Sequence, residues 1–185
     1  EAPLMRPAQV RRTGAVALGL GGLLAVVGQL VAPLEENVAT FVTDPRFLPG
    51  QLLVFAGSLL IVLGLPAAYG WATERLGVSG LVGFGGVMVG VTLFGVFLSL
   101  LFGLVLPWTV DGLPAAQAEQ GPPALGIFFP VAGTITTIGA ILFGLAIARS
   151  VVYSPWLGYL LIAAGVIQFL IGALGENLGI PKRVC

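Results

Sequence analysis

Two glutamate–asparagine groups are the residues best suited to bind a ligand. Glu35, Glu36 and Asn37 follow one long apolar run, and Glu176 and Asn177 follow another. A carboxylate at a helix C-terminus opposes the helix dipole, so local helix stability does not explain the glutamates. The five side chains could form an outer polar cluster that binds a cation or a partner's basic residues. Alternatively, the asparagines cap the two helices and the glutamates are simply solvated.

A second polar set lies within the apolar runs, where polar side chains are costly and mark function by default. It comprises Gln29, Gln168, Thr134, Thr136 and Thr137. The glutamines could bond between helices, or they could line a ligand or quinone-like site. The threonine hydroxyls could join that intramembrane polar site, or they could bond to the carbonyl four residues earlier on their own helix.

Several chemistries are excluded by residue types that the sequence lacks. There is no histidine, which removes the commonest metal ligand and the usual general base, and the one cysteine is Cys185. HExxH, GxSxG and P-loop motifs are absent, so we expect no catalytic activity, no metal site and no cofactor. No carboxylate or base lies in the middle of an apolar run, which disfavours ion-coupled transport. The net charge is zero, and this disfavours nucleic-acid binding.

The composition indicates that lipid is the solvent. Hydrophobic residues make up 57% of the chain and charged residues 9%, and the mean hydropathy is +1.06. A soluble domain carries about 25% charged residues. A membrane-spanning helix needs roughly 20 apolar residues, and five segments meet this criterion. They are residues 13–34, 50–72, 80–107, 125–148 and 156–175. The sequence therefore predicts an all-α polytopic transmembrane helix bundle, forming one integral membrane domain over residues 1–185.

Glycines recur at intervals of seven residues in every predicted helix. Residues seven apart share a helix face, and a face of small residues lets two helices approach closely in lipid. We therefore expect these glycines to pack helices together, although one such face could instead dock a partner subunit or a flat cofactor. The candidates are Gly14, Gly21, Gly28, Gly57, Gly64, Gly83, Gly90, Gly133, Gly158, Gly165 and Gly172.

Three of the predicted helices also resemble one another. Each has a glycine pair seven residues apart that begins eight or nine residues after an arginine. The segments are GGLLAVVG (21–28) after Arg12, GFGGVMVG (83–90) after Arg75, and GYLLIAAG (158–165) after Arg149. This pattern predicts a degenerate repeat of helical hairpins.

Basic residues set the expected orientation. Arginines at positions 6, 11, 12, 75 and 149 fall on one side of the predicted membrane, which indicates a cytoplasmic N-terminus and an outer C-terminus. Lys182 and Arg183 depart from this rule, unless a further helix follows Cys185. Trp71, Trp108 and Trp156 fall at predicted helix ends, which is typical of interfacial aromatic residues. We expect a bacterial inner-membrane protein.

Two functions are compatible with this sequence. The first is a non-catalytic accessory or structural subunit that packs against a larger membrane complex, for example an energy-transducing one. The second is a small-solute or lipid-like carrier or channel, which would need a polar cavity around Gln29 and Gln168. The expected partners are membrane lipids and either other membrane subunits or further copies of the chain.

Overall fold

The described part of the protein is entirely helical. The structure, a computed structural model, describes residues 7–33, 42–110 and 123–174. Its elements are α1 (Pro7–Val31), α3 (Phe47–Gly90), the π-helix η1 (Val91–Phe97), α4 (Leu98–Leu100), the π-helix η2 (Leu101–Val105), α5 (Leu106–Val110), α7 (Pro123–Arg149) and α8 (Pro155–Leu174). Three stretches are long and apolar enough to cross a membrane: Ala8–Val31, Phe47–Trp108 and Ile127–Arg149. These findings support an all-α integral membrane protein.

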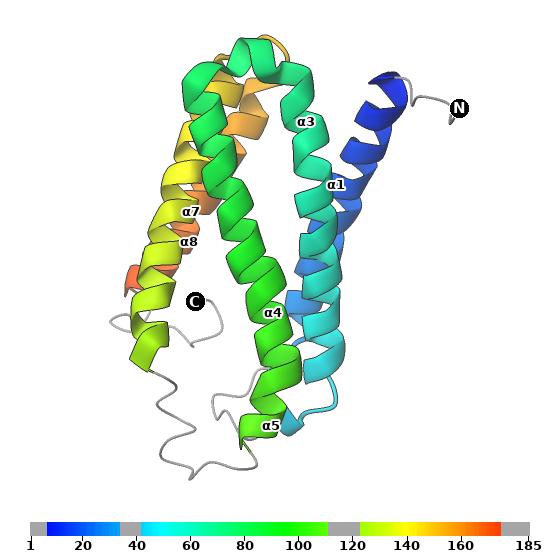
Figure 1. The fold of residues 1–185 in the computed structure, drawn as a ribbon, viewed down its shortest axis with the longest axis vertical. Helices are drawn as coiled ribbons and strands as arrows, with labels where there is room; N and C mark the ends of the chain where they lie inside the picture. The colour runs from blue at the N-terminus through cyan, green and yellow to red at the C-terminus, as the bar shows by residue number, and fades with distance from the viewer. Residues whose placement is uncertain (1–6, 34–41, 111–122, 175–185) are drawn as a thin grey trace, which may run out of the picture.

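Gly77 interrupts the longest of these stretches. Its φ of 61° and ψ of −165° are non-helical and lie in a region that is accessible almost only to glycine. Figure 1 shows that α3 turns back on itself at one end of the molecule. The turn divides α3 into a first limb (residues 47–76) and a second limb (residues 78–90), and η1, α4, η2 and α5 continue the second limb.

The largest differences from the predicted helix boundaries lie in two places. Helix α1 begins at Pro7 rather than Thr13, because arginines at a helix end can reach the polar interface and do not stop the helix. The predicted break at residues 73–80 is helical on both sides of Gly77, so that prediction was too wide. Between α7 and α8, by contrast, the chain leaves the helix at residues 150–154, within the predicted turn.

Packing proceeds mainly from one helix to the next along the chain. Helix α1 packs against the first limb of α3, the second limb packs against α7, and α7 packs against α8. The first limb also contacts η1, α4 and η2. Among the described residues, neither α1 nor α8 has a second helix packed along its length.

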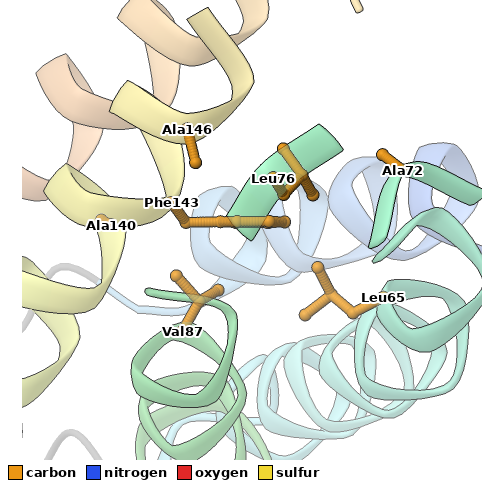
Figure 2. Close-up of a cluster of buried hydrophobic side chains, with 7 residues drawn as sticks. All are labelled: Leu65, Ala72, Leu76, Val87, Ala140, Phe143 and Ala146. Atoms are coloured by element: carbon orange, nitrogen blue, oxygen red, sulfur yellow. The ribbon is translucent and has the colours of Figure 1, made fainter. Parts of the chain in front are cut away.

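A small core joins the two limbs of α3 to α7. Figure 2 shows it: Leu65, Ala72, Leu76, Val87, Ala140, Phe143 and Ala146. Two ring contacts extend this core, since Phe84 stacks on Tyr69 at 4.5 Å between centroids and meets Phe143 edge-on at 6.0 Å. Large apolar side chains elsewhere face outward, and Leu30 and Val78 are each 79% exposed. Contact of these side chains with lipid carries no free-energy cost, whereas their exposure to water would be unfavourable.

Candidate functional site

The predicted outer polar cluster lies outside the described residues. Glu35, Glu36 and Asn37 fall in the segment 34–41, and Glu176 and Asn177 fall in the segment 175–185. The described segment that follows residues 34–41 contains an ion pair of Asp44 and Arg46, whose Oδ2 and Nη2 atoms lie 2.9 Å apart.

The Asp44–Arg46 pair organises the start of α3. Backbone N–H of Arg46 donates to Asp44 Oδ1 at 2.7 Å, and that of Phe47 donates to the Asp44 carbonyl at 2.9 Å. The side-chain hydrogen bond from Arg46 lowers the pKa of Asp44, and the backbone bond acts in the same direction. Asp44 and Arg46 therefore form a local turn that precedes the helix.

The two glutamines of the predicted intramembrane site lie apart. Gln29 is exposed on α1, and Gln168 is exposed on α8. Figure 1 places these helices on opposite sides of the molecule, with α3 and α7 between them. The described residues therefore bring Gln29 and Gln168 to no common cavity.

The three threonines of that site already have acceptors. Thr134 donates to the Pro130 carbonyl and Thr136 to the Ala132 carbonyl, both at 2.7 Å and both within α7. Thr137 instead reaches the Gly165 carbonyl on α8 at 3.4 Å. Two of the hydroxyls thus follow the own-helix alternative, and the third is directed to a neighbouring helix rather than to a ligand.

One open groove lies on the outer face of α3 and η1. Met88, Val89, Thr92 and Leu93 line it, and its volume is about 280 Å³. Thr92 is its single polar lining residue, and none of the predicted polar residues reaches it. Within the described ranges, no group of three Asp, Glu, Cys or His residues could hold a metal ion.

Close backbone contacts are the more informative feature, and they begin between α1 and the first limb of α3. A Cβ atom added to Gly21 would lie 2.6 Å from the Gly57 carbonyl oxygen. A Cβ added to Gly28 would lie 2.7 Å from the Gly50 carbonyl oxygen, and a Cβ added to Gly14 would meet the side chain of Ala67. These positions leave no space for a side chain, because real Cβ atoms essentially never approach a neighbour within 3.0 Å.

The close contacts between α1 and the first limb are reciprocal. A Cβ added to Gly57 would lie 2.5 Å from the Gly21 carbonyl oxygen, and one added to Gly64 would lie 2.8 Å from that of Gly14. Glycines spaced seven residues apart on α1 therefore meet glycines spaced seven apart on the antiparallel limb, once in every two helical turns.

Helix α7 has two further faces of this kind. Towards the second limb, a Cβ added to Gly86 would lie 2.7 Å from Gly139 Cα, and one on Gly83 or Gly90 would meet Phe143 or Thr136. Towards α8, a Cβ added to Gly144 would lie 2.6 Å from the Gly158 carbonyl oxygen.

The remaining glycines differ in their surroundings. A Cβ added to Gly165 would lie 2.8 Å from Ala140 Cβ, whereas one on Gly133 would meet nothing within 4 Å. The surroundings of Gly172 are not described, although its backbone belongs to α8. Gly133 therefore makes no close helix contact within the described chain.

Sequence reasoning missed several of the contact glycines and two buried hydroxyls. The predicted seven-residue series omits Gly86, Gly95, Gly139 and Gly144. Ser58 and Ser99 are 4% and 5% exposed, and both face the packing between the first limb and the π-helical stretch. Ser58 lies directly beside Gly95, a contact that only the paired helices could reveal.

A linked set of aromatic and basic groups ties three segments together at the end that carries the Gly77 turn. The guanidinium carbon of Arg11, on α1, lies 4.7 Å from the ring centre of Trp71 on α3. Trp71 meets Tyr153 edge-on at 5.7 Å, and the Tyr153 hydroxyl donates to the Ala68 carbonyl at 2.6 Å. Through these contacts, the α7–α8 turn and α1 are both fixed to the same part of α3.

Comparisons with known proteins add no assignment to this arrangement. No protein-family model, curated protein or solved structure matches the chain. The case for a function therefore depends on the geometry of the described residues.

Proposed function

We propose that this protein is a non-catalytic accessory subunit that packs against a larger membrane complex. The observation that carries the proposal is the one-sided packing of α1 and α8. Each is a long apolar helix that contacts one neighbouring helix within the described chain and turns large side chains outward. Such helices are suited to receive further helices in a membrane assembly.

Helix lengths support five membrane crossings in this proposal. A continuous helix over Phe47–Trp108 would have 62 residues and a length of about 93 Å, three times the hydrocarbon thickness of about 30 Å. The Gly77 turn divides it into two lengths of at least 45 Å, each sufficient for one crossing. With α1, α7 and the 20-residue α8, the five crossings would form serial hairpins.

The close glycine contacts would then hold the hairpins together. Lipid removes the hydrophobic drive for helix association, so van der Waals contact between backbones becomes the main attraction. Gly21 supplies such a contact between α1 and the first limb, Gly86 between the second limb and α7, and Gly144 between α7 and α8. A cytoplasmic N-terminus in a bacterial inner membrane fits the arginines at the Gly77 end of this array.

The carrier alternative finds less support. A carrier needs convergent polar groups around a solute, whereas Gln29 and Gln168 lie on separate outer helices. The threonines of α7 donate to carbonyl oxygens, which leaves no free donor in that set. We therefore favour the accessory subunit.

Extraction from the native membrane in a mild detergent tests the proposal. The expected result is co-purification of a larger membrane complex in fixed stoichiometry, identified by mass spectrometry. Photo-crosslinking residues in place of Leu23 on α1 and Leu160 on α8 should trap subunits of that complex, because both side chains face outward.

A matched crosslinker at the buried Phe143 should trap no partner, since it faces the protein's own core. Recovery of the chain alone, with no crosslink from either outer helix, would count against the accessory role. A retained solute in that preparation would instead favour the carrier.

A further inference from the structure

Four arginines gather at the end of the molecule that carries the Gly77 turn. Arg11 and Arg12 lie near the start of α1, Arg75 lies two residues before Gly77, and Arg149 is the last residue of α7. Figure 1 shows the start of α1, the turn of α3 and the α7–α8 connection at the same end. Glu74 is the one acidic residue described there.

Contacts between the three segments hold these arginines at the same end of the molecule. The contact of Arg11 with Trp71 fixes the start of α1 to α3. On the other side, a Cβ added to Gly80 would lie 3.3 Å from Ala146 Cβ, so the end of α7 packs beside the turn of α3. Arg75 and Arg149 each follow these packed positions within about a turn or two of helix.

The four guanidinium groups are not equivalent. Arg11 lies over the Trp71 ring and is used in holding α1. Arg12, Arg75 and Arg149 are exposed, and none of them forms an ion pair or side-chain hydrogen bond with the described residues. Arg46, at the other end of α3, is by contrast bonded to Asp44 through two of its side-chain nitrogens.

The positions of Arg12, Arg75 and Arg149 indicate which anion these side chains would contact. Trp71, Tyr153 and Trp156 lie near the same helix ends, and such residues sit at the level of lipid headgroups in a membrane. Guanidinium groups at that level face phosphate oxygens, to which they can donate two parallel hydrogen bonds.

We propose that Arg12, Arg75 and Arg149 form a binding face for the phosphate groups of anionic phospholipids. This inference does not depend on the accessory role, because a subunit and a carrier could both use it. One basic residue near a membrane surface contributes about fivefold to the affinity for anionic lipid, so three contribute on the order of 100-fold.

The test is native mass spectrometry of the full chain in detergent, titrated with phosphatidylglycerol and with phosphatidylcholine of the same acyl chains. Wild type should bind the glycerol lipid on the order of 100-fold more tightly. The variant R12Q/R75Q/R149Q should lose that preference, and R12K/R75K/R149K should keep most of it, because lysine retains the charge. The matched control R46Q should behave as wild type, since Arg46 already has its partner.

Three results would overturn the proposal. The first is an unchanged lipid preference in the triple glutamine variant, and the second is an equal loss of preference in R46Q. The third is tight binding of inorganic phosphate that displaces the lipid, which would show a site for a soluble anion. The triple variant is folded if its circular dichroism spectrum equals that of wild type. If it is not folded, the same lipid titration is carried out on the three single variants.

Discussion

Alanine at Gly21 and at Gly22 gives a paired test of the glycine contacts. The two residues are neighbours on α1 and gain the same methyl group. A Cβ at Gly21 would lie 2.6 Å from the Gly57 carbonyl oxygen and 2.9 Å from Ile61 Cγ1, whereas one at Gly22 would meet nothing within 4 Å. The difference in unfolding free energy between the two variants therefore isolates helix packing.

The expected magnitude follows from the displacement that the methyl group requires. Carbon atoms reach their best contact at about 3.5–4.0 Å, so α1 and the first limb of α3 must separate by nearly 1 Å around Gly21. A gap of this size forfeits about a quarter to a half of the local dispersion energy, and overpacking typically costs 1–3 kcal/mol. Alanine also favours helix over glycine by about 1 kcal/mol, but both variants share that gain.

G21A should thus be less stable than G22A by about 1–3 kcal/mol, a factor of roughly 5 to 150 in the folded-to-unfolded ratio. Reversible unfolding in mixed detergent micelles, followed by circular dichroism, measures the difference. The double variant G21A/G57A should lose less than the sum of its single variants, because the first methyl group already separates the helices. Equal stability of G21A and G22A would refute the packing argument.

Three other predictions address the turn and the contacts near it. Gly77→Ala should lower the unfolding free energy by about 1–3 kcal/mol relative to the control Gly70→Ala in thermal unfolding, because of these two residues only Gly77 has a glycine-specific backbone conformation. Tyr153→Phe should cost about 0.5–1.5 kcal/mol in the same assay by removing a hydrogen bond to α3. Burial raises the pKa of Tyr153, so the folded state keeps its proton while the unfolded state releases it; wild type should therefore lose stability above about pH 10, and Tyr153→Phe should lack that loss. Arg11→Gln should cost about 0.5–1 kcal/mol and alter the fluorescence of Trp71, whereas Arg11→Lys should change both less.

Helical membrane segments could be predicted from the sequence, but their ends were less certain. Long apolar runs and clustered prolines and glycines indicate where helices cross lipid, because few other structures satisfy the backbone there. Charged residues were wrongly taken to end the helices at the start of α1 and in the middle of α3. Helix α1 accommodates Arg11 and Arg12, and α3 remains helical through Glu74 and Arg75 up to Gly77.

The π-helices could not have been found from composition. They shift the helix face by about one residue, and such a shift is visible only where polar and apolar residues alternate. Residues 91–105 are almost uniformly apolar, so their sequence carries no periodic signal. The same uniformity hid the burial of Ser58 and Ser99, since the burial of a residue here depends on which helix lies opposite.

The separation of the predicted polar site has a similar origin. Gln29 and Gln168 occupy comparable positions in two similar predicted helices, which suggested a common site. Similar positions in repeated hairpins do not converge unless the array closes on itself, and the described helices pack in series. The likeness of the two segments therefore does not place their glutamines in a shared site.

Hydrophobicity alone does not decide which side chains are buried in this protein. Alanines such as Ala72, Ala132 and Ala146 are buried, while Leu30 and Leu63 face outward, because a leucine loses nothing in lipid and an approaching backbone needs space. Leucine positions therefore do not indicate which helices meet. Glycine positions do so only in part, since Gly22 and Gly133 are open while Gly21 is in contact. At Gly21 and Gly86 the contact depends on a second glycine opposite in register, which is a property of a helix pair and not of one helix.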